Sequence, residues 1–141
     1  MKEFSVKWIS SKQPRKQRKY RYNAPMHVRQ RLVSAHLEKM LRKEYGKRSL
    51  TVRKGDEVRI MTGQFRGTRG KVSRVDMKAL KVYVENAKMK KVSGQEVEVA
   101  IDPSNIMITK LNFDDKRRRK FIIRKGKKQE TKETGGKAKG K

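Results

Sequence analysis

The chain contains no cysteine, only 3 prolines and few acidic or aromatic residues among its 141 positions. Without cysteine it has no disulfide, no thiolate nucleophile and no zinc site with Cys ligands. It has no apolar run of about 18 residues and no uninterrupted apolar segment at its N-terminus, so we expect neither a membrane span nor a signal peptide. Hydrophobic residues make up only 33% of the chain, which leaves little room for a catalytic pocket, so we do not expect an enzyme.

Basic residues, by contrast, are abundant. The chain has 41 Lys and Arg against 14 Asp and Glu, a formal net charge of +27. Such a charge attracts polyanions, of which nucleic acid is the simplest inside a cell and an acidic membrane the alternative. The excess lies at both ends: residues 1–48 carry 15 basic and 3 acidic side chains, residues 49–115 carry 13 and 9, and residues 116–141 carry 13 and 2. We therefore expect a folded module in the middle, flanked by basic arms.

The N-terminal part is expected to hold an arm followed by helix. Residues 10–23 have one proline, six Lys or Arg and two tyrosines without any periodicity, which predicts an extended arm. Pro25 suits the first turn of a helix, and Gly46 suits a helix end. Between them, apolar residues recur at helical spacing at Leu37, Met40, Leu41 and Tyr45. We expect helix over residues 24–48, either as one helix or as two short ones broken near Ser34.

The apolar pattern changes to a period of two from Thr51 onwards. Five short runs predict strands, at residues 58–60, 72–75, 80–84, 97–101 and 106–108. Glycines and the sequence Asp102-Pro103-Ser104-Asn105 supply turns. Five short strands in so few residues predict a small, strongly bent β-barrel, because a flat sheet of that size leaves its edges exposed. The expected domains are a basic N-terminal arm (1–23), a helical extension (24–48), the barrel (49–113) and a basic C-terminal extension (114–141) with a low-complexity end.

One stretch carries a specific motif. Residues 53–72, RKGDEVRIMTGQFRGTRGKV, combine K-G-D before an alternating strand, a G-x-aromatic-x-G loop and a G-K-V return. They resemble the KOW motif, a strand-loop-strand unit of SH3-like barrels in ribosomal proteins and transcription elongation factors. Gly55 and Gly63 suit turn positions with positive φ. Gly67 and Gly70 let the backbone reverse or approach a phosphate closely.

Further segments resemble one family in the same order and spacing, at residues 22–27, 41–46, 48–50 and 102–109. Over about residues 12–120 the chain is similar to the archaeal and eukaryotic form of the universal large-subunit ribosomal protein twenty-four, numbered twenty-six in eukaryotes. Lys54-Gly55-Asp56 resembles the archaeal version. The resemblance implies a mainly β fold, in which a small SH3-like KOW barrel carries a helical, basic N-terminal extension and a basic C-terminal tail.

The same resemblance implies a function. It is that of a structural constituent of the large ribosomal subunit, present once per ribosome in the cytoplasm. Such a protein binds the 5′ region of large-subunit rRNA through its basic arms and KOW loop, assists early subunit assembly and lies near the peptide exit tunnel. The partners implied are that rRNA, neighbouring large-subunit proteins and, at the tunnel exit, targeting factors. We expect no cofactor.

We expect five groups of residues to contact RNA. In the arm, cations alternate with rings that can stack on unpaired bases, at Arg15, Lys16, Arg18, Lys19, Tyr20, Arg21, Tyr22 and Asn23. The start of the expected helix, whose N–H groups attract phosphate, adds His27, Arg29 and Arg31. The KOW loop, with short polar side chains and exposed backbone N–H groups, adds Thr62, Gly63, Gln64, Arg66, Gly67 and Thr68. The next loop adds Lys88, Lys90 and Lys91, and the segment after the barrel adds Arg117, Arg118 and Arg119.

Each group also has a purely structural interpretation. The alternatives are a solvated arm, an exposed helix face, a simple turn, solubilising lysines and a helix surface or flexible run of arginines. Phe65 in the KOW loop either packs against the core, which we favour, or stacks on a base.

The sequence offers no metal or catalytic site. His27 and His36 stand nine residues apart with no cysteine nearby, which is too few ligands for a metal. Asp56-Glu57 lies in a turn and Asp114-Asp115 in a linker, and no Ser-His-Asp or nucleotide-binding motif has usable spacing. The rival functions are a transcription elongation factor, a general RNA or DNA chaperone and, remotely, a phosphoryl-handling enzyme. The first normally adds an N-terminal α/β domain, for which residues 1–48 are too short and too basic.

Overall fold

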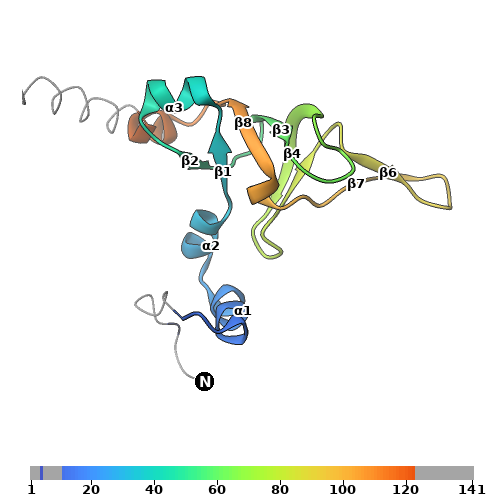
Figure 1. Ribbon diagram of the computed structural model, residues 1–141, viewed down its shortest axis with the longest axis horizontal. Coiled ribbons are helices and arrows are strands. Elements are labelled where there is room, and N and C mark those ends of the chain that lie inside the picture. Colours follow the sequence, from blue (N-terminus) through green and yellow to red (C-terminus); the bar gives the residue numbers. More distant parts are fainter. Residues whose placement is uncertain (1–3, 5–10, 123–141) are drawn as a thin grey trace, which may run out of the picture.

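The computed structural model describes residue 4 and residues 11–122. In chain order, the elements are α1 (Pro14–Asn23), α2 (Met26–Leu32), β1 (Ser34–Leu37), α3 (Lys39–Tyr45), β2 (Ser49–Thr51), β3 (Glu57–Ile60), β4 (Arg69–Asp76), β5 (Lys81–Val84), β6 (Lys88–Lys90), β7 (Glu96–Glu98), a 3₁₀ turn η1 (Pro103–Asn105) and β8 (Ile106–Lys110). Residues 116–122 are also helical. The strands gather in one body, from which α1 and α2 extend on one side and the β6–β7 hairpin on another (Figure 1). The expected mainly β fold with a helical N-terminal segment is confirmed.

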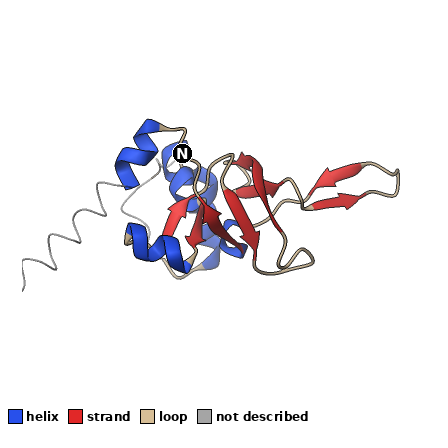
Figure 2. Cartoon of the chain, turned by 90° about the horizontal axis from the view of Figure 1, so that it is seen from above, coloured by secondary structure: helices blue, strands red, loops and turns tan. Residues whose placement is uncertain are grey.

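Six strands form one sheet in the order β2-β1-β8-β3-β4-β5, and β6 pairs with β7 in a separate hairpin. Neighbouring strands of the sheet are antiparallel, apart from β1 and β8, which run parallel. An isolated bridge between Val82 and Ile101 returns the chain to β5 after the hairpin. In Figure 2 the hairpin projects from the body as a separate two-stranded unit.

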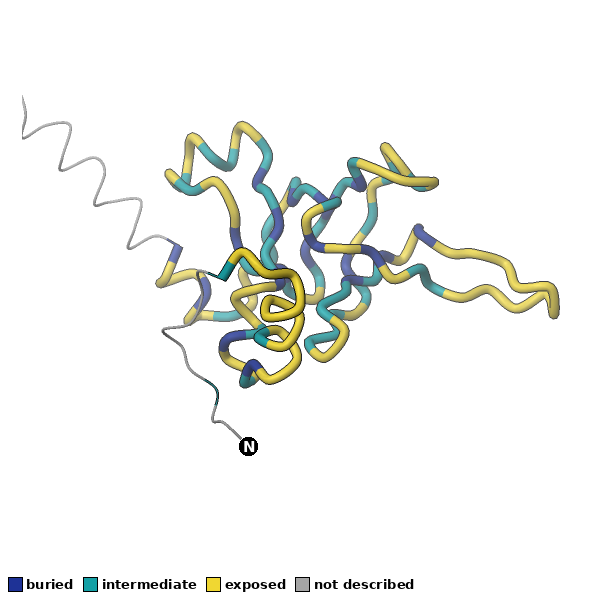
Figure 3. Tube along the Cα trace, turned by 60° about the horizontal axis from the view of Figure 1, so that its bottom comes forward, coloured by how far each residue is buried: buried dark blue, intermediate teal, exposed yellow. Residues whose placement is uncertain are grey.

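The core of the body is built from β-branched residues on alternating strand positions. In β3, β5 and β8 the inward residues are Val58 and Ile60, Val82 and Val84, and Ile106 and Ile108, all of them buried. Val and Ile suit this pleated, buried setting. The hairpin and α1, in contrast, are almost entirely exposed (Figure 3). The buried apolar residues therefore stabilise mainly the body. The hairpin and α1 gain little stability from this core, because their side chains are exposed.

The N-terminal arm is helical, which corrects the expectation of an extended segment. Residues 14–23 form α1, with Pro14 in the first turn and the Gln17 N–H donating to the Gln13 carbonyl at 3.1 Å. The helix buries none of its residues. A helix without a buried face has no apolar periodicity to reveal it, and only the good helix propensity of Lys, Arg and Gln favours it.

A second correction concerns the expected helix over residues 24–48. The chain forms two short helices, as one alternative had it, but they flank strand β1, which the sequence analysis missed. Ala35 and Leu37 of β1 are buried, and the strand pairs with both β2 and β8. Leu37 happens to continue the helical spacing of Leu41 and Tyr45 in α3, so four strand residues were assigned to helix. Residues 34–37 thus belong to the sheet, while the exact domain limits stay a prediction.

Other local expectations are confirmed. Gly46 ends α3 in a left-handed conformation with φ 58°, and Asp102-Pro103-Ser104-Asn105 forms a turn as η1. Four of the five predicted strands correspond to β3, β4, β5 and β8, whereas the run at 97–101 overlaps β7 only at residues 97 and 98. Strands β2 and β6, of three residues each, were missed, because segments so short carry too few alternating positions to be recognised.

The C-terminal helix is attached to the body at its start. Asp115 caps it, since the Arg117 N–H donates to Asp115 Oδ1 at 2.7 Å. The same carboxylate pairs with Arg53, from the turn between β2 and β3. Ile122 is fully buried in the core of the body. The low-complexity end at residues 135–141 lies outside the described residues.

Candidate nucleic-acid interface

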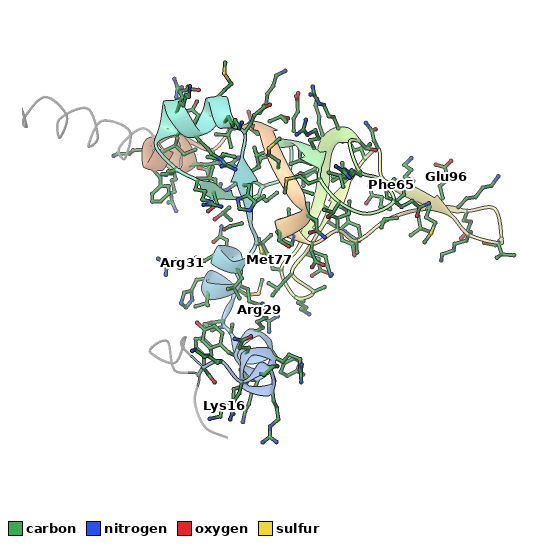
Figure 4. The ribbon with its side chains drawn as sticks, in the orientation of Figure 1. Lys16, Arg29, Arg31, Phe65, Met77 and Glu96 are labelled. Carbon is green, nitrogen blue, oxygen red and sulfur yellow. The ribbon has the colours of Figure 1, made fainter. Side chains whose placement is uncertain are left out.

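Helix α1 presents the largest run of exposed cations. Arg15, Lys16, Arg18, Lys19 and Arg21 are exposed, and the ten residues of the helix include no acidic side chain. Because an α-helix advances about 100° per residue, these cations surround the helix rather than marking one face. Such a helix can neutralise phosphates on more than one side, and Lys16 marks its place in Figure 4.

The two tyrosines of α1 have different surroundings. Tyr22 is 81% exposed, so its ring is available for stacking on an unpaired base. Tyr20 is half-buried, and its ring lies 4.9 Å from that of Phe4, measured between centroids. One side of the Tyr20 ring is thus covered by Phe4. Asn23, the last residue of the helix, is exposed.

At the start of α2, only two of the three predicted contacts point to solvent. His27 and Arg31 are exposed, and in Figure 4 Arg31 and Arg29 lie on opposite sides of the helix. The Arg29 guanidinium donates hydrogen bonds to backbone carbonyls: Nε to Ala24 at 2.8 Å, and Nη2 to Tyr22. Its Nη1 lies 3.5 Å from the Lys78 carbonyl in the β4–β5 turn. Arg29 is therefore an anchor that joins α1 and α2 to the body.

The KOW loop between β3 and β4 is exposed at Thr62, Gly63, Gln64, Arg66 and Gly67, and half-buried at Thr68. Gly63 and Gly67 have φ of 90° and 89°, as the motif requires. Phe65 packs against the core of the body, which confirms the favoured interpretation, and Figure 4 shows its position. The loop is thus a rigid turn that presents Arg66 outward.

Two details of the loop correct the sequence interpretation. The backbone N–H groups of Arg66, Gly67 and Thr68 donate to carbonyls of Gly63, Ile60 and Phe65, at 2.8 to 3.1 Å, so they cannot follow an RNA backbone. Gly70 allows a close protein contact rather than a phosphate contact, because a Cβ there would lie 2.8 Å from Val84 Cγ1. These three N–H groups are therefore engaged within the fold.

Two of the three predicted lysines of the β6–β7 hairpin, Lys88 and Lys90, face acidic partners. Lys88 Nζ lies 3.4 Å from Glu96 Oε2, and the strand register places Lys88 opposite Glu98 and Lys90 opposite Glu96. Lys91 is exposed near the tip. Because cross-strand pairs of opposite charge offset one another, the hairpin attracts phosphate less than its lysines alone suggest.

Arg118 is buried inside the fold, which disagrees with its prediction as an RNA contact. It is 5% exposed, and its guanidinium makes a two-point ion pair with the buried carboxylate of Asp56. Arg117 and Arg119, on either side of it in the helix, are exposed. Only these two of the three arginines remain available to phosphates.

Over residues 11–122, three exposed arginines were not among the predicted contacts, namely Arg48, Arg69 and Arg74. Arg74 in β4 lies with its Cζ 4.2 Å from the centre of the Tyr83 ring. A register shift between Val72 and Arg74 breaks the alternation, so that Val72 faces the core and Arg74 faces solvent. Arg74 borders an open groove of about 970 Å³, together with Lys54, Met77 and other residues. Because Val72 faces the core, strict alternation predicts that Arg74, two residues later, also faces inward. The bulge between them turns the Arg74 side chain outward.

The acidic and histidine side chains are dispersed over the part of the chain that the structure describes. No three His, Asp or Glu side chains within residues 11–122 gather as metal ligands. The carboxylate of Asp56 is fully buried and engaged in the fold. Burial, with a smaller effect of Glu44, raises the pKa of Tyr45 to about 12, which keeps this hydroxyl protonated. Over the described residues, no helix is long and apolar enough to cross a membrane.

These observations define a class of protein first. A small β domain fixes exposed cations on a helical arm, on a tight loop and on the helical residues 116–122, an arrangement typical of modules that bind polyanions. Residues 11–125 match the model of the family that comprises the eukaryotic L26 and the archaeal L24 ribosomal proteins. The chain is also 52% identical over 112 residues to "Large ribosomal subunit protein uL24" of Methanosarcina barkeri. The matched region covers 79% of this chain and 97% of that protein. The chain belongs to this family: it is a structural ribosomal protein of cytoplasmic ribosomes, and not an enzyme.

Proposed function

We propose that the chain is a constituent of the large ribosomal subunit that binds its rRNA at several sites. Helix α1 is the observation that carries this proposal, because it holds five exposed cations and no acidic residue, and none of its residues is fully buried. A helix with this composition has no role in the core of the domain. Its charge is compensated when it lies against phosphates.

The other contacts follow the same chemistry. Arg31 and His27 on α2, Arg66 in the KOW loop, and Arg117 and Arg119 on the C-terminal helix are all exposed. They leave the body at separate places, so that one molecule can touch RNA segments that are distant in the RNA sequence. Neutralising phosphates where RNA helices converge releases counterions and removes repulsion between the helices. The β body sets the distances between these contacts.

Family resemblance supports the finer parts of the proposal. We infer that the site is the 5′ region of large-subunit rRNA, that the protein binds early in assembly, and that one copy lies near the peptide exit tunnel. Neighbouring large-subunit proteins and targeting factors are the protein partners. The proposed mechanism is electrostatic assistance to RNA folding, with specificity coming from the shape of the RNA.

Sedimentation of a native lysate through a sucrose gradient at high salt tests the proposal. We expect the protein in the large-subunit and polysome fractions, in amounts stoichiometric with the subunit after a salt wash. Recovery with RNA polymerase favours an elongation factor, and recovery in the free pool, with equal affinity for random duplex and rRNA, favours a general chaperone. Either result contradicts the proposed function.

A further inference from the structure

The carboxylate of Asp56 accepts four hydrogen bonds inside the body. Asp56 follows the turn between β2 and β3 and is 0% exposed. Its Oδ2 accepts from the Arg53 N–H at 2.9 Å and from Arg118 Nη2 at 2.7 Å. Its Oδ1 accepts from the Asn112 N–H at 2.9 Å and from Arg118 Nη1 at 2.5 Å. One side chain thus joins the turn, the linker after β8 and the C-terminal helix.

Arg118 completes the junction from the other side. Its Nη1 also donates to the Asn112 carbonyl at 2.9 Å, and its Nη2 to the Thr51 carbonyl at 3.1 Å. The guanidinium is therefore held in one plane by partners from three segments of the chain. A planar fork with two carboxylate oxygens in register fixes direction as well as distance.

This junction determines which way the C-terminal helix faces. Arg118 and Ile122 are four residues apart, so they lie on one face of the helix, and both are buried. The other cations of the helix, Lys116, Arg117, Arg119 and Lys120, are exposed. These two inward side chains therefore resist rotation of residues 116–122 about the helix axis.

We propose that Asp56 and Arg118 form a positioning pair that sets the rotation of helix 116–122, so that Arg117 and Arg119 face outward as an ordered RNA contact. The inference rests on the proposed function, because it takes rRNA phosphates as the partner of these two arginines. A buried ion pair is a poor source of net stability, because both charges lose their hydration. The two-point geometry of the Asp56–Arg118 pair does, however, fix the direction in which Arg117 and Arg119 point.

The variant Asp56→Asn separates positioning from simple electrostatics, because the two predict opposite signs. It removes one negative charge, so summed charge alone predicts equal or tighter binding to RNA. Loss of the positioning pair predicts weaker binding, by about three- to tenfold in Kd, and a shallower salt dependence. The probe is a transcript of the 5′ region of large-subunit rRNA, titrated with the full chain over a salt series.

Asp102→Asn is the matched control. It removes the same charge from an exposed aspartate, which pairs with Lys81 at 2.7 Å on the surface. We expect this variant to bind the transcript as tightly as the wild type or slightly more tightly. A drop in affinity equal to that of Asp56→Asn overturns the inference.

A double variant guards against simple misfolding. Asp56→Asn with Arg118→Gln keeps the net charge and leaves no buried charge without a partner, so it perturbs folding less than either single change. The decisive measurement is the affinity for the transcript after Arg117→Ala and Arg119→Ala are added together to three backgrounds. These are the wild type, Asp56→Asn and the double variant. We expect about a tenfold loss of affinity in the wild type and less than about twofold in the variants, because residues that act together are not additive.

The outcomes are distinct. Equal losses from Arg117 and Arg119 in every folded background, or no loss in the wild type, overturn the positioning role. Unfolding of both Asp56 variants, seen by circular dichroism, makes the pair a folding requirement and also overturns it. If the wild type fails to bind the transcript, the proposed function fails instead. In that case amide hydrogen exchange of the free protein measures the positioning role. The amides of residues 116–122 should exchange faster in the Asp56 variants than in the wild type.

Discussion

Gly55 and Gly63 have nearly the same backbone conformation and very different surroundings. Their φ angles are 86° and 90°, in the region that disfavours side chains. A Cβ on Gly55 would lie 2.6 Å from Asn112 Nδ2, whereas nothing lies within 4 Å of a Cβ on Gly63. Asn112 Nδ2 in turn donates to Asp114 Oδ2 at 2.8 Å. At the residue scale, therefore, the turn before β3 is packed and the KOW loop is open.

Replacing each glycine with alanine should reveal this difference. We expect Gly63→Ala to cost about 1 kcal/mol of unfolding free energy, from the strained φ alone. Gly55→Ala should cost about 2 to 3 kcal/mol, because the new Cβ also displaces Asn112 from its hydrogen bond. Urea unfolding of the two variants measures both values. Equal losses would show that Asn112 moves aside without cost.

At the element scale, the two projections of the molecule carry charge in different ways. Helix α1 has exposed cations with no acidic residue of its own, whereas in the β6–β7 hairpin lysines on one strand face glutamates on the other. Figure 4 shows Lys16 and Glu96 on these two separate projections. The elements are therefore expected to contribute unequally to RNA binding, although each holds several lysines or arginines.

The salt dependence of binding should separate these two elements. Removing Arg18 and Lys19 together should reduce the slope of log affinity against log salt by about 0.7 to 0.9 for each phosphate that is no longer neutralised. Removing Lys88 and Lys90 should change the slope by less than half as much, because Glu96 and Glu98 already offset them. Filter binding to the rRNA transcript provides the slopes. Equal changes would place the hairpin among the main RNA contacts.

The turn between β4 and β5 is held by Asp76. Its Oδ1 accepts from the Lys78 N–H at 2.8 Å and from the Ala79 N–H at 3.0 Å. These bonds, led by the one from Ala79, hold the pKa of this carboxyl below its ordinary value of 3.8. A depressed pKa means that the folded state favours the charged form. Because the Arg29 anchor meets the Lys78 carbonyl, the same turn supports the N-terminal arm.

Stability should therefore depend on the charge of Asp76 in acid. Its contribution is fully present above the unfolded pKa and is lost as pH falls through the lower folded pKa. We expect the wild type to be more stable than Asp76→Asn near neutral pH, and the difference to shrink as the pH falls below 3.8. Thermal unfolding across an acid pH series checks this. A difference that does not change with pH would contradict the role of the charge.

At the scale of the whole molecule, the net charge of +27 acts on folding and on binding in opposite directions. In the free protein the cations repel one another, and this destabilises the compact state. On RNA the same cations replace counterions, and this favours binding. Salt weakens both effects.

Added salt should therefore stabilise the free protein and weaken its complex. Raising the ionic strength from about 0.05 to about 0.5 M shortens the screening length severalfold, so we expect a higher unfolding temperature. Over the same range the affinity for rRNA should fall steeply. Calorimetry of the free protein and binding titrations provide the two measurements. A free protein that salt destabilises would show that attractive ion pairs outweigh the repulsion.

Composition and pattern by themselves determined much of this protein. The missing cysteine, the excess of Lys and Arg and the glycine-rich motif were enough to predict a small, mainly β, polyanion-binding protein, because charge and turn chemistry are local properties of the sequence. Alternation located β3, β5 and β8, where successive residues meet core and solvent in turn. Helix α1 and strand β1 escaped, the first because none of its residues is buried and the second because Leu37 also fits the helical spacing of Leu41 and Tyr45.

Only the tertiary structure decided which cations face outward. Arg117, Arg118 and Arg119 are identical and adjacent in the sequence, yet the middle one is buried against Asp56, 62 residues away. Arg29 bonds to carbonyls while Arg31 is exposed, and a bulge turns Arg74 outward. The direction of a side chain depends on partners that folding brings together from distant segments, and no local pattern records them.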